Sequence, residues 1–301
     1  MTPEHPRPFV SVIVPVLNMP RAIRRCVEAL LAQSYPRDRY EIIIVDNGST
    51  DDTVRVIGEY PARLLVEQDT QSPYAARNLG LRHAKGEIIA LTDADCTPMP
   101  DWIERGVEAL DSAPADLIGG HVRFLFSPKR TAAEMYDSIA NLEMKNSITL
   151  RGEAKTGNLF ARRKVFDTIG DFPGQTRSGG DRFWTGRASR SGFKLLYNPD
   201  VVVGKEARTL LRLLKKSYRI GKGTPAVWLD RHRGVPGMGK SLVRDALPPP
   251  PSGIRNQINE RGTPDMKQRF AVLWFVAWLC GLSNTAGRLH GFFVLLQLKG
   301  R

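Results

Sequence analysis

Four apolar segments rich in β-branched residues constrain the fold of this 301-residue chain more than any other feature. They occupy residues 9–16, 41–45, 63–66 and 87–92. Each is a nearly continuous apolar run rather than a strict alternation of apolar and polar positions. Strands of this kind are covered on both faces, which is typical of a parallel sheet. The first hundred residues therefore predict a parallel sheet.

Helix patterns fill the gaps between these segments. Apolar residues between positions 23 and 31 fall on one face of a helix, and Asp52 can cap a short helix further on. Ser72 and Pro73 have the character of an N-cap and a first helical residue, and Gly86 follows the end of that helix. The alternating order of strands and helices indicates an open α/β sheet.

The pattern changes near residue 101, where helices and strands follow less regularly, and again near residue 205. We expect residues 101–204 to complete the same sheet. Residues 205–301 predict a helical C-terminal appendage, with a stiff proline-rich linker at 247–251. The predicted fold class is thus an α/β open sheet, mostly parallel and flanked by helices.

The formal charge of +13 is concentrated in the appendage. Residues 205–244 contain 11 lysines and arginines and only two acids, a net charge of +9. Interleaved leucines make this segment amphipathic, which is typical of contact with an anionic surface such as a membrane or nucleic acid. A solvated helix face explains the same pattern equally well. We found no aromatic-basic motif typical of nucleic-acid binding and expect no nucleic-acid partner.

Two apolar pieces, residues 270–282 and 291–298, follow the basic segment. Each is shorter than the roughly 20 residues that a membrane-spanning helix needs. Arg288 and His290 lie between them. This pattern favours a helix that lies at the membrane interface, or one that packs on the domain, over a span.

The three cysteines, Cys26, Cys96 and Cys280, are too far apart for a zinc motif or a disulfide framework. They fit a reducing cytoplasm. The N-terminus shows no basic segment followed by an apolar stretch, so we expect no signal peptide. The expected location is cytoplasmic, with peripheral attachment to the cytoplasmic face of the membrane as an extension.

Acidic residues follow two of the predicted strands. Asp46 ends the strand at 41–45, and Asp93 and Asp95 end the strand at 87–92. Ligands of open α/β sheets bind beyond the carboxyl ends of the strands, so these carboxylates should share one edge. An Asp-x-Asp pair suits a hard divalent ion, Mg²⁺ or Mn²⁺, that also binds substrate phosphates.

Phosphate-binding loops of the common kinds do not follow the predicted strands. No GxGxxG motif opens the first helix, and the GxxxxGK[ST] string at 234–241 lies in the basic C-terminal segment, not after any of the four strands. A metal ion and basic side chains must therefore neutralise any bound diphosphate, as in the transfer of sugars from nucleotide donors.

The sequence resembles the family-2 glycosyltransferases, inverting enzymes of the GT-A fold. The resemblance runs from about residue 10 to residue 210. Five motifs occur in the family's order: Val12–Asn18, Ile44–Thr53, Ala76–Gly80, Thr92–Asp95 and Gly157–Phe160.

The resemblance implies a role for each matching residue. Asp95 would be the metal ligand, Asp93 the ribose contact, and Asp46 an acceptor of a hydrogen bond from the nucleotide base. Asn158 and Trp184 would contact the acceptor, Trp184 by stacking on a sugar, with a position in the protein core as the alternative for Trp184. The full set of nucleotide-sugar contacts would be Pro15, Leu17, Asn18, Asp46, Ser49, Arg77, Asp93 and Ala94.

The catalytic base implied by the resemblance is Asp181, in the segment Ser178-Gly179-Gly180-Asp181. Family members often carry Glu before this aspartate, where the present chain has Gly180. A second departure is Lys205, close to where many relatives have a histidine. The implied reaction is a single displacement in which Asp181 deprotonates an acceptor hydroxyl.

The sequence patterns and the resemblance together divide the chain. Residues 1–100 would form the half that binds the nucleotide sugar, and 101–204 the acceptor-side half. Residues 205–301 would form basic, amphipathic and apolar helices that contact a membrane or pack on the domain. The donor would be a UDP- or GDP-sugar, and the acceptor a saccharide, a lipid or a small molecule. Two alternatives remain: a non-catalytic nucleotide-sugar-binding protein at the membrane, and a sugar nucleotidyltransferase.

Overall fold

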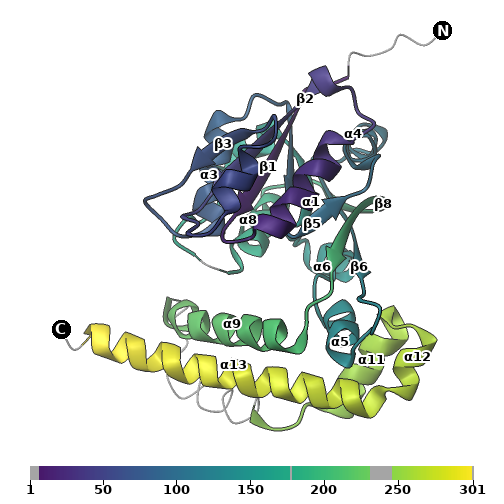
Figure 1. The fold of residues 1–301 in the computed structure, drawn as a ribbon, viewed down its shortest axis with the longest axis vertical. Helices are drawn as coiled ribbons and strands as arrows, with labels where there is room; N and C mark the ends of the chain where they lie inside the picture. Colours follow the sequence, from purple (N-terminus) through teal and green to yellow (C-terminus); the bar gives the residue numbers. More distant parts are fainter. Residues whose placement is uncertain (1–6, 177, 231–245, 300–301) are drawn as a thin grey trace. The chain divides into compact units, whose positions relative to one another are not determined.

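A computed structural model describes residues 7–176, 178–230 and 246–299 (Figure 1). The chain divides into two compact units. The first unit contains Met1–Arg123 and Leu142–Lys205, and the second contains Phe124–Asn141 and Glu206–Arg301. An eight-stranded sheet with the order β3-β2-β1-β4-β7-β6-β8-β5 organises the first unit.

The first four strands in the sequence form the parallel part of this sheet, as their apolar runs predict. Strand β1 lies between β2 and β4, with Val16 level with Asp46 and Ile13 level with Leu91. Every residue of β1 and β4 is buried because helices cover both faces. The four strands are β1 (Val10–Val16), β2 (Tyr40–Asp46), β3 (Arg63–Val66) and β4 (Ile88–Thr92).

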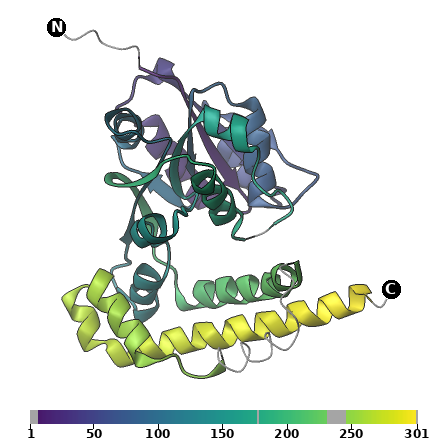
Figure 2. The same ribbon diagram turned by 180° about the vertical axis from the view of Figure 1, so that it is seen from behind.

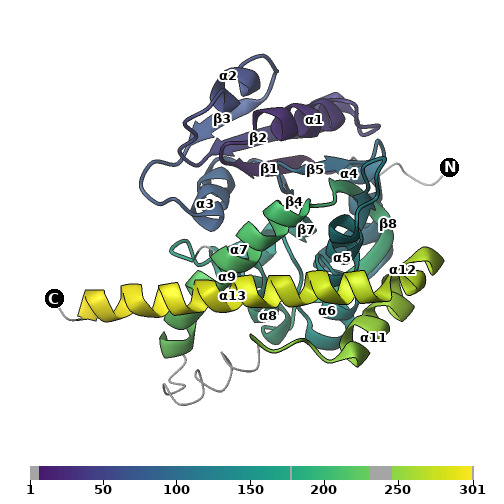
Figure 3. The ribbon, with the colours of Figure 1, turned by 60° about the horizontal axis from the view of Figure 1, so that its bottom comes forward.

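Three helices cover this parallel part. Helices α1 (Pro20–Leu31) and α2 (Thr53–Ile57) lie on one face, and α3 (Pro73–His83) lies on the other (Figure 3). Helix α3 begins where the sequence predicts, with the Ser72 side chain accepting a hydrogen bond from the amide of Tyr74. Gly80 allows α3 to approach the sheet closely, because a Cβ there would lie 2.6 Å from the side chain of Ile13.

The remaining strands are antiparallel, so the sheet is mixed rather than mostly parallel. Strand β7 pairs with β4 and with β6, and β5 pairs with β8. These strands are β5 (Cys96–Pro98), β6 (Leu117–Leu125), β7 (Asn158–Arg162) and β8 (Leu195–Glu206). The helices between them are α4 (Trp102–Ser112), α6 (Lys145–Arg151), α7 (Arg163–Ile169) and α8 (Gly180–Arg190).

The second unit is helical (Figure 2). Its helices are α5 (Ala132–Ala140), α9 (Leu210–Asp230), α11 (Pro251–Arg261), α12 (Pro264–Gln268) and α13 (Phe270–Lys299). Met135 and Ile139 of α5 pack in one apolar cluster with Ile258 and Leu273. The segment 124–141, expected within the acceptor-side half, therefore lies with the C-terminal helices in this unit.

Helices α9 and α13 lie side by side and run in the same direction (Figure 1). Their backbones approach closely at glycines, since a Cβ on Gly221 would lie 2.0 Å from the carbonyl oxygen of Asn284, and one on Gly287 would lie 2.1 Å from that of Tyr218. The Ser283 hydroxyl donates to the carbonyl of Leu214 at 2.8 Å. Small residues of this kind allow tight helix pairing.

Helix α13 corrects the prediction of two short apolar pieces. It is one continuous helix through residues 283–285, because Ser283 and Asn284 bond to α9 instead of ending the helix. Among the described helices, α13 alone is long and apolar enough to cross a membrane by length and composition, over Phe270–Val294. His290 also contacts α9, through the Tyr218 hydroxyl, and 28% of the most apolar window of α13 is buried within the protein.

Candidate active site

The loops after β1 and β2 are joined by two hydrogen bonds. The Asn18 side chain accepts a hydrogen bond from the amide of Thr50 at 2.8 Å, and the hydroxyl of Ser49 accepts one from the amide of Asn18 at 2.9 Å. Asn18 has a positive φ of 52°, which asparagine tolerates better than most residues. Pro15 is buried and Leu17 is half-buried next to this junction. Four predicted nucleotide contacts thus lie together.

Asp46 has one carboxylate oxygen engaged and one available. Its Oδ2 accepts hydrogen bonds from the amides of Gly48 at 3.1 Å and Ser49 at 3.0 Å. The side chain is buried, yet none of the described residues donates to Oδ1. A buried carboxylate oxygen without a donor is costly, and a bound N–H group would satisfy it.

Arg77 links helix α3 to the acidic pair after β4. Its guanidinium donates to Oδ1 of Asp93 at 2.7 Å and to the carbonyl of Pro73 at 3.3 Å. Arg77 is 3% exposed, so this ion pair is shielded from water on the arginine side. Asp93 also lies against Gly157, where a Cβ would come within 3.1 Å of Oδ2.

The second aspartate of the pair, Asp95, is bound by a lysine from β8. The ammonium group of Lys205 contacts Oδ1 of Asp95 and lies 3.7 Å from Oδ2 of Asp93. One ligand atom each of Asp93, Asp95 and Cys96 lies within 4.8 Å of the others. Burial raises the pKa of the Cys96 thiol to about 12, so this group stays protonated and adds no charge. Ala94 between the aspartates is buried and contributes no polar side chain.

Asp181 lies in the first turn of α8 and is half-buried. Its Oδ1 accepts hydrogen bonds from the Tyr74 hydroxyl at 3.2 Å and from the amide of Arg182 at 2.9 Å. Burial, together with the negative charge of Asp181, raises the pKa of Tyr74. Tyr74 therefore remains a hydrogen-bond donor at neutral pH.

Steric constraints explain why a glycine precedes Asp181 in this chain. A Cβ on Gly180 would lie 2.9 Å from the ring of Tyr74 and 2.8 Å from the hydroxyl of Thr176. The glutamate common in the family would therefore clash with the tyrosine that holds Asp181.

Continuous contacts connect Asp181 to the acidic pair. Tyr74 bonds to Asp181, and the guanidinium of Arg77, one turn later on α3, lies 5.6 Å from the centre of the Tyr74 ring. Arg77 in turn pairs with Asp93. The structure thus brings the predicted base, the predicted metal ligand and the predicted ribose contact to one region, and Asp46 ends the strand next to β1.

Asn158 is a structural residue, which corrects its expected contact with the acceptor. It is fully buried, its amide donates to the carbonyls of His121 at 2.9 Å and Val201 at 2.8 Å, and its oxygen accepts from the indole of Trp102 at 2.9 Å. With these polar atoms engaged, the side chain offers nothing to an acceptor.

Trp184 is also buried, which fits the core position and not stacking on an acceptor sugar. Its ring packs on Phe166 at 4.4 Å and Phe172 at 4.8 Å, and its indole N–H donates to the carbonyl of Gly170 at 2.7 Å. The side chain lies in the core beneath α8.

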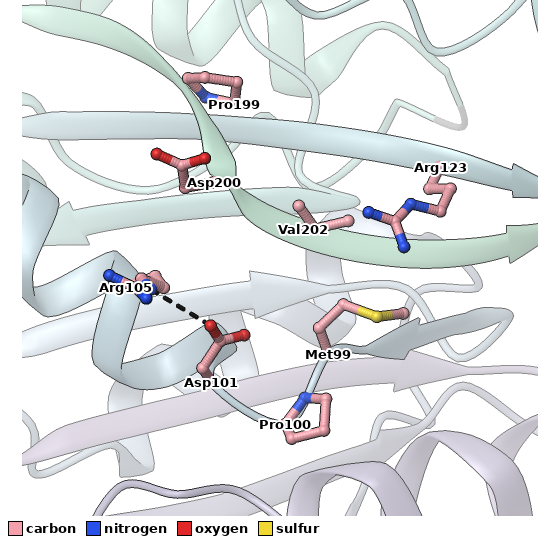
Figure 4. Close-up of a pocket in the computed structure, with 8 residues that line it drawn as sticks. All are labelled: Met99, Pro100, Asp101, Arg105, Arg123, Pro199, Asp200 and Val202. Carbon is pink, nitrogen blue, oxygen red and sulfur yellow. Dashed lines mark hydrogen bonds and ion pairs between the residues drawn. The ribbon is translucent and has the colours of Figure 1, made fainter.

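A surface pocket lies between residues 99–105, which follow β5, and residues 199–202 of β8 (Figure 4). It has a volume of about 560 Å³, and an Asp101–Arg105 ion pair of 3.2 Å lies at its rim. None of the predicted site residues lines it. Its lining residues are Met99, Pro100, Asp101, Arg105, Arg123, Pro199, Asp200 and Val202.

Two residues of this region carried no clear signal in the sequence. Tyr74 reads as an ordinary aromatic in the first turn of a helix, and its contact with Asp181 depends on tertiary structure. Lys205 was visible only as a departure from the family pattern, and nothing in the sequence shows that it is buried.

The fold and these carboxylates are those of the GT-A class of enzymes, which transfer sugars from nucleotide donors. The profile of Glycosyl transferase family 2 matches residues 11–179. The chain belongs to this family and is a glycosyltransferase.

Two relatives extend over most of the chain. "Glycosyltransferase AglE" of Haloferax volcanii is 41% identical over 290 residues, covering 94% of this chain and 95% of that protein. A Methanococcus voltae protein named "Dolichyl N-acetyl-alpha-D-glucosaminyl phosphate 3-beta-D-2,3-diacetamido-2,3-dideoxy-beta-D-glucuronosyltransferase" is 25% identical over 242 residues, covering 71% of this chain and 73% of that protein.

Solved structures share the fold at low sequence identity. Mannosyltransferase PcManGT of Pyrobaculum calidifontis, in complex with GDP-Man and Mn²⁺, has a TM-score of 0.58 at 20% identity, covering 98% of this chain and 76% of that one. S. aureus TarS 1–349 in complex with UDP-GlcNAc has a TM-score of 0.54 at 17% identity, covering 95% and 92%.

Proposed function

We propose that this glycosyltransferase transfers a sugar from a nucleoside-diphosphate sugar to an acceptor hydroxyl, with inversion at the anomeric carbon and Asp181 as general base. The observation that carries this proposal is the series of contacts from Asp181 through Tyr74 and Arg77 to Asp93. These contacts connect the proposed general base, Asp181, to a potential diphosphate-binding site. The complexes of PcManGT with GDP-Man and TarS with UDP-GlcNAc support a donor of this class.

The donor nucleotide is proposed to lie over the ends of β1 and β2. The unpartnered Oδ1 of Asp46 would accept a hydrogen bond from an N–H group of the base. Asn18 and Ser49 fix the loop that carries this carboxylate, with Pro15 and Leu17 beside them. Asp93 would contact the ribose, and Arg77 would face the diphosphate while it holds Asp93.

A divalent cation, Mg²⁺ or Mn²⁺, fits the carboxylates of Asp93 and Asp95. Both are only partly exposed and close together, and oxygen donors suit these hard ions. When bound, such an ion would be held chiefly by Asp95 and would supply a Lewis acid for charge on the departing diphosphate.

Asp181 is proposed to remove the proton from the acceptor hydroxyl as the oxygen attacks the sugar. General-base catalysis of this kind contributes roughly 10²–10⁴-fold to the rate. Tyr74 and the amide of Arg182 orient Oδ1, which leaves Oδ2 for the incoming proton. Gly180 does not weaken the case for catalysis, because Tyr74 occupies the space of the missing side chain.

The acceptor is proposed to be a hydroxyl of a saccharide, and a lipid-linked one is favoured over a small molecule. The M. voltae relative is named as a glucuronosyltransferase of dolichyl N-acetyl-alpha-D-glucosaminyl phosphate, a lipid-linked saccharide. The second unit exposes apolar side chains of α9 and α13, among them Leu211, Phe275 and Phe293. It also exposes the basic side chains of Arg212, Lys215 and Lys222 on α9. Apolar and basic groups together suit an anionic membrane surface on the cytoplasmic side.

Part of the basic segment that motivates this membrane proposal, residues 231–244, lies outside the described residues. The division into a donor-binding half at 1–100 and an acceptor-side half at 101–204 remains a proposal of the same kind.

The variant Asp181→Asn tests the proposed base. The amide keeps the shape of the carboxylate, so binding of UDP or GDP should change less than about threefold, while kcat should fall roughly 10²–10⁴-fold. Binding is measured by calorimetry and turnover by release of nucleoside diphosphate in the presence of acceptor. The donor and metal are first identified by thermal stabilisation with a panel of nucleotide sugars plus Mn²⁺ or Mg²⁺.

The matched control is Asp167→Asn, an exposed aspartate on α7. It should leave both quantities unchanged. Loss of nucleotide binding in Asp181→Asn would place Asp181 in the donor site instead. Binding without any nucleoside diphosphate release in the wild-type protein would favour the non-catalytic alternative, and release of pyrophosphate would favour nucleotidyl transfer.

A further inference from the structure

Lys205 is a buried cation beside the two carboxylates of the Asp-x-Asp pair. Its side chain is 2% exposed. Its ammonium group contacts Oδ1 of Asp95, lies 3.7 Å from Oδ2 of Asp93 and donates to the sulfur of Cys96 at 3.6 Å. An ammonium group carries three N–H donors, which suits a position surrounded by several acceptors.

The sheet holds this lysine in place. Lys205 is level with Cys96 in the antiparallel pairing of β8 with β5, and Val203 before it is fully buried. A buried ammonium group is costly unless it is paired with an anion. The position of the Lys205 ammonium group is therefore determined both by the register of β8 with β5 and by the two carboxylates.

Both carboxylates have a cationic partner before any substrate arrives. Arg77 pairs with Asp93, and Lys205 pairs with Asp95. A divalent ion would thus meet carboxylates that are already paired, with a fixed positive charge beside them.

We propose that Lys205 is the resident counter-ion of Asp93 and Asp95, and that it makes binding of a divalent cation depend on the nucleoside diphosphate. A diphosphate brings the negative charge and the oxygen ligands that the protein alone lacks. This inference deepens the proposed function, because it concerns the same carboxylates, but its principal test uses the protein without nucleotide.

The test is titration of the full chain with Mn²⁺, with free Mn²⁺ measured by electron paramagnetic resonance. Without nucleotide, Lys205→Met should bind Mn²⁺ at least about tenfold more tightly than the wild-type protein, because the carboxylates lose their internal cation. Adding Asp95→Asn to Lys205→Met should abolish the gain. The matched control Lys194→Met, an exposed lysine just before β8, should behave as the wild type.

A second measurement needs no variant. The wild-type protein should bind Mn²⁺ at least about tenfold more tightly when UDP or GDP is present, whichever of the two it binds. Equal Mn²⁺ affinity of the wild type with and without that nucleotide would overturn the proposal. So would a folded Lys205→Met or Lys205→Gln protein, verified by thermal melting, that shows no gain in affinity.

The outcomes separate this inference from the proposed function. If neither nucleotide binds, the proposed donor class fails, while the comparison of Lys205→Met with wild type still decides the role of the lysine. If both nucleotide and Mn²⁺ bind but the lysine variant shows no gain, Lys205 is a structural ion pair and only the inference fails.

Discussion

The hydroxyl of Tyr74 donates a hydrogen bond to Oδ1 of Asp181 at 3.2 Å, although 107 residues separate them in the sequence. Tyr74 lies in the first turn of the helix that also carries Arg77, whose guanidinium binds Asp93. One helix, α3, therefore orients a carboxylate on the proposed acceptor side and another on the proposed donor side.

Tyr74→Phe tests whether this hydrogen bond positions the base. The ring remains in its packing site, but Asp181 loses one donor, and a hydrogen bond to a charged group is worth about 1.5–3 kcal/mol. We expect kcat to fall at least about tenfold, while KM for the donor stays within about twofold. Steady-state kinetics with saturating acceptor measures both values.

Tyr60→Phe is the control for that substitution, because the Tyr60 hydroxyl bonds to Glu28 on the outer side of α1. It should leave both kinetic constants unchanged. An equal loss of kcat in the two variants, or a rise in KM alone for Tyr74→Phe, would contradict a positioning role.

The sequence predicts the donor side of this site better than the acceptor side. Asp46, Asp93 and Asp95 could be located because strand ends in a parallel sheet share one edge. The contact of Tyr74 with Asp181 could not, since it joins the first turns of two helices far apart in the chain. The burial of Trp184 could not be settled from the sequence, since a tryptophan near the proposed base suits both a core position and a sugar-stacking one.

The direction of the antiparallel strands and the continuity of α13 could not be predicted from the sequence either. Strand β7 reads as apolar in the sequence, but its direction beside β4 depends on chain connectivity rather than on composition. Polar residues 283–285 suggested a break in a helix, whereas in the structure Ser283 and Asn284 bond to α9. Local propensity gives way where tertiary partners satisfy the polar groups.

Asp46→Asn tests the nucleotide base site. The asparagine oxygen can still accept from the amides of Gly48 and Ser49, so the loop should keep its conformation. Its NH₂ group would then face a base N–H, and two donors repel. We expect the affinity for UDP or GDP to fall at least about tenfold, with the melting temperature almost unchanged. Asp52→Asn, exposed beside the same loop, is the control, and equal nucleotide affinity in the two variants would exclude the assigned contact.

Asn158→Ala tests the structural role that replaces its expected acceptor contact. The change leaves the carbonyls of His121 and Val201 and the indole N–H of Trp102 without their partner. Each buried unpaired group costs about 1–3 kcal/mol, so the free energy of unfolding should fall by about 3–5 kcal/mol. Urea unfolding measures this, with Asn146→Ala on α6 as a partly exposed control. A stable Asn158→Ala protein that has lost only acceptor binding would restore the original assignment.

The buried tyrosines predict a loss of stability at high pH. Burial raises the pKa of Tyr35 to about 12, and its hydroxyl donates to the carbonyl of Pro8 at 2.7 Å. Because the unfolded tyrosine ionises near pH 10, the stabilising contribution is complete below that pH and is lost as the pH rises towards 12. Urea unfolding at pH 9 and pH 11 should show a smaller decline for Tyr35→Phe than for the wild type. Parallel declines would show that Tyr35 ionises as readily in the folded state.

Charge reversal on the basic face of α9 tests the proposed membrane contact. Arg212→Glu combined with Lys215→Glu reverses two exposed charges on this helix. Each basic residue near an anionic bilayer contributes about 1 kcal/mol, so partitioning onto phosphatidylserine-containing vesicles should fall at least about tenfold. Sedimentation with vesicles at two salt concentrations measures this, and the wild-type affinity should decrease with salt. The same charge reversal at Lys145 and Arg151 on α6 should have little effect. If wild-type protein binds neither anionic nor neutral vesicles, the exposed apolar side chains of α9 and α13 must contact another partner, and the membrane proposal fails.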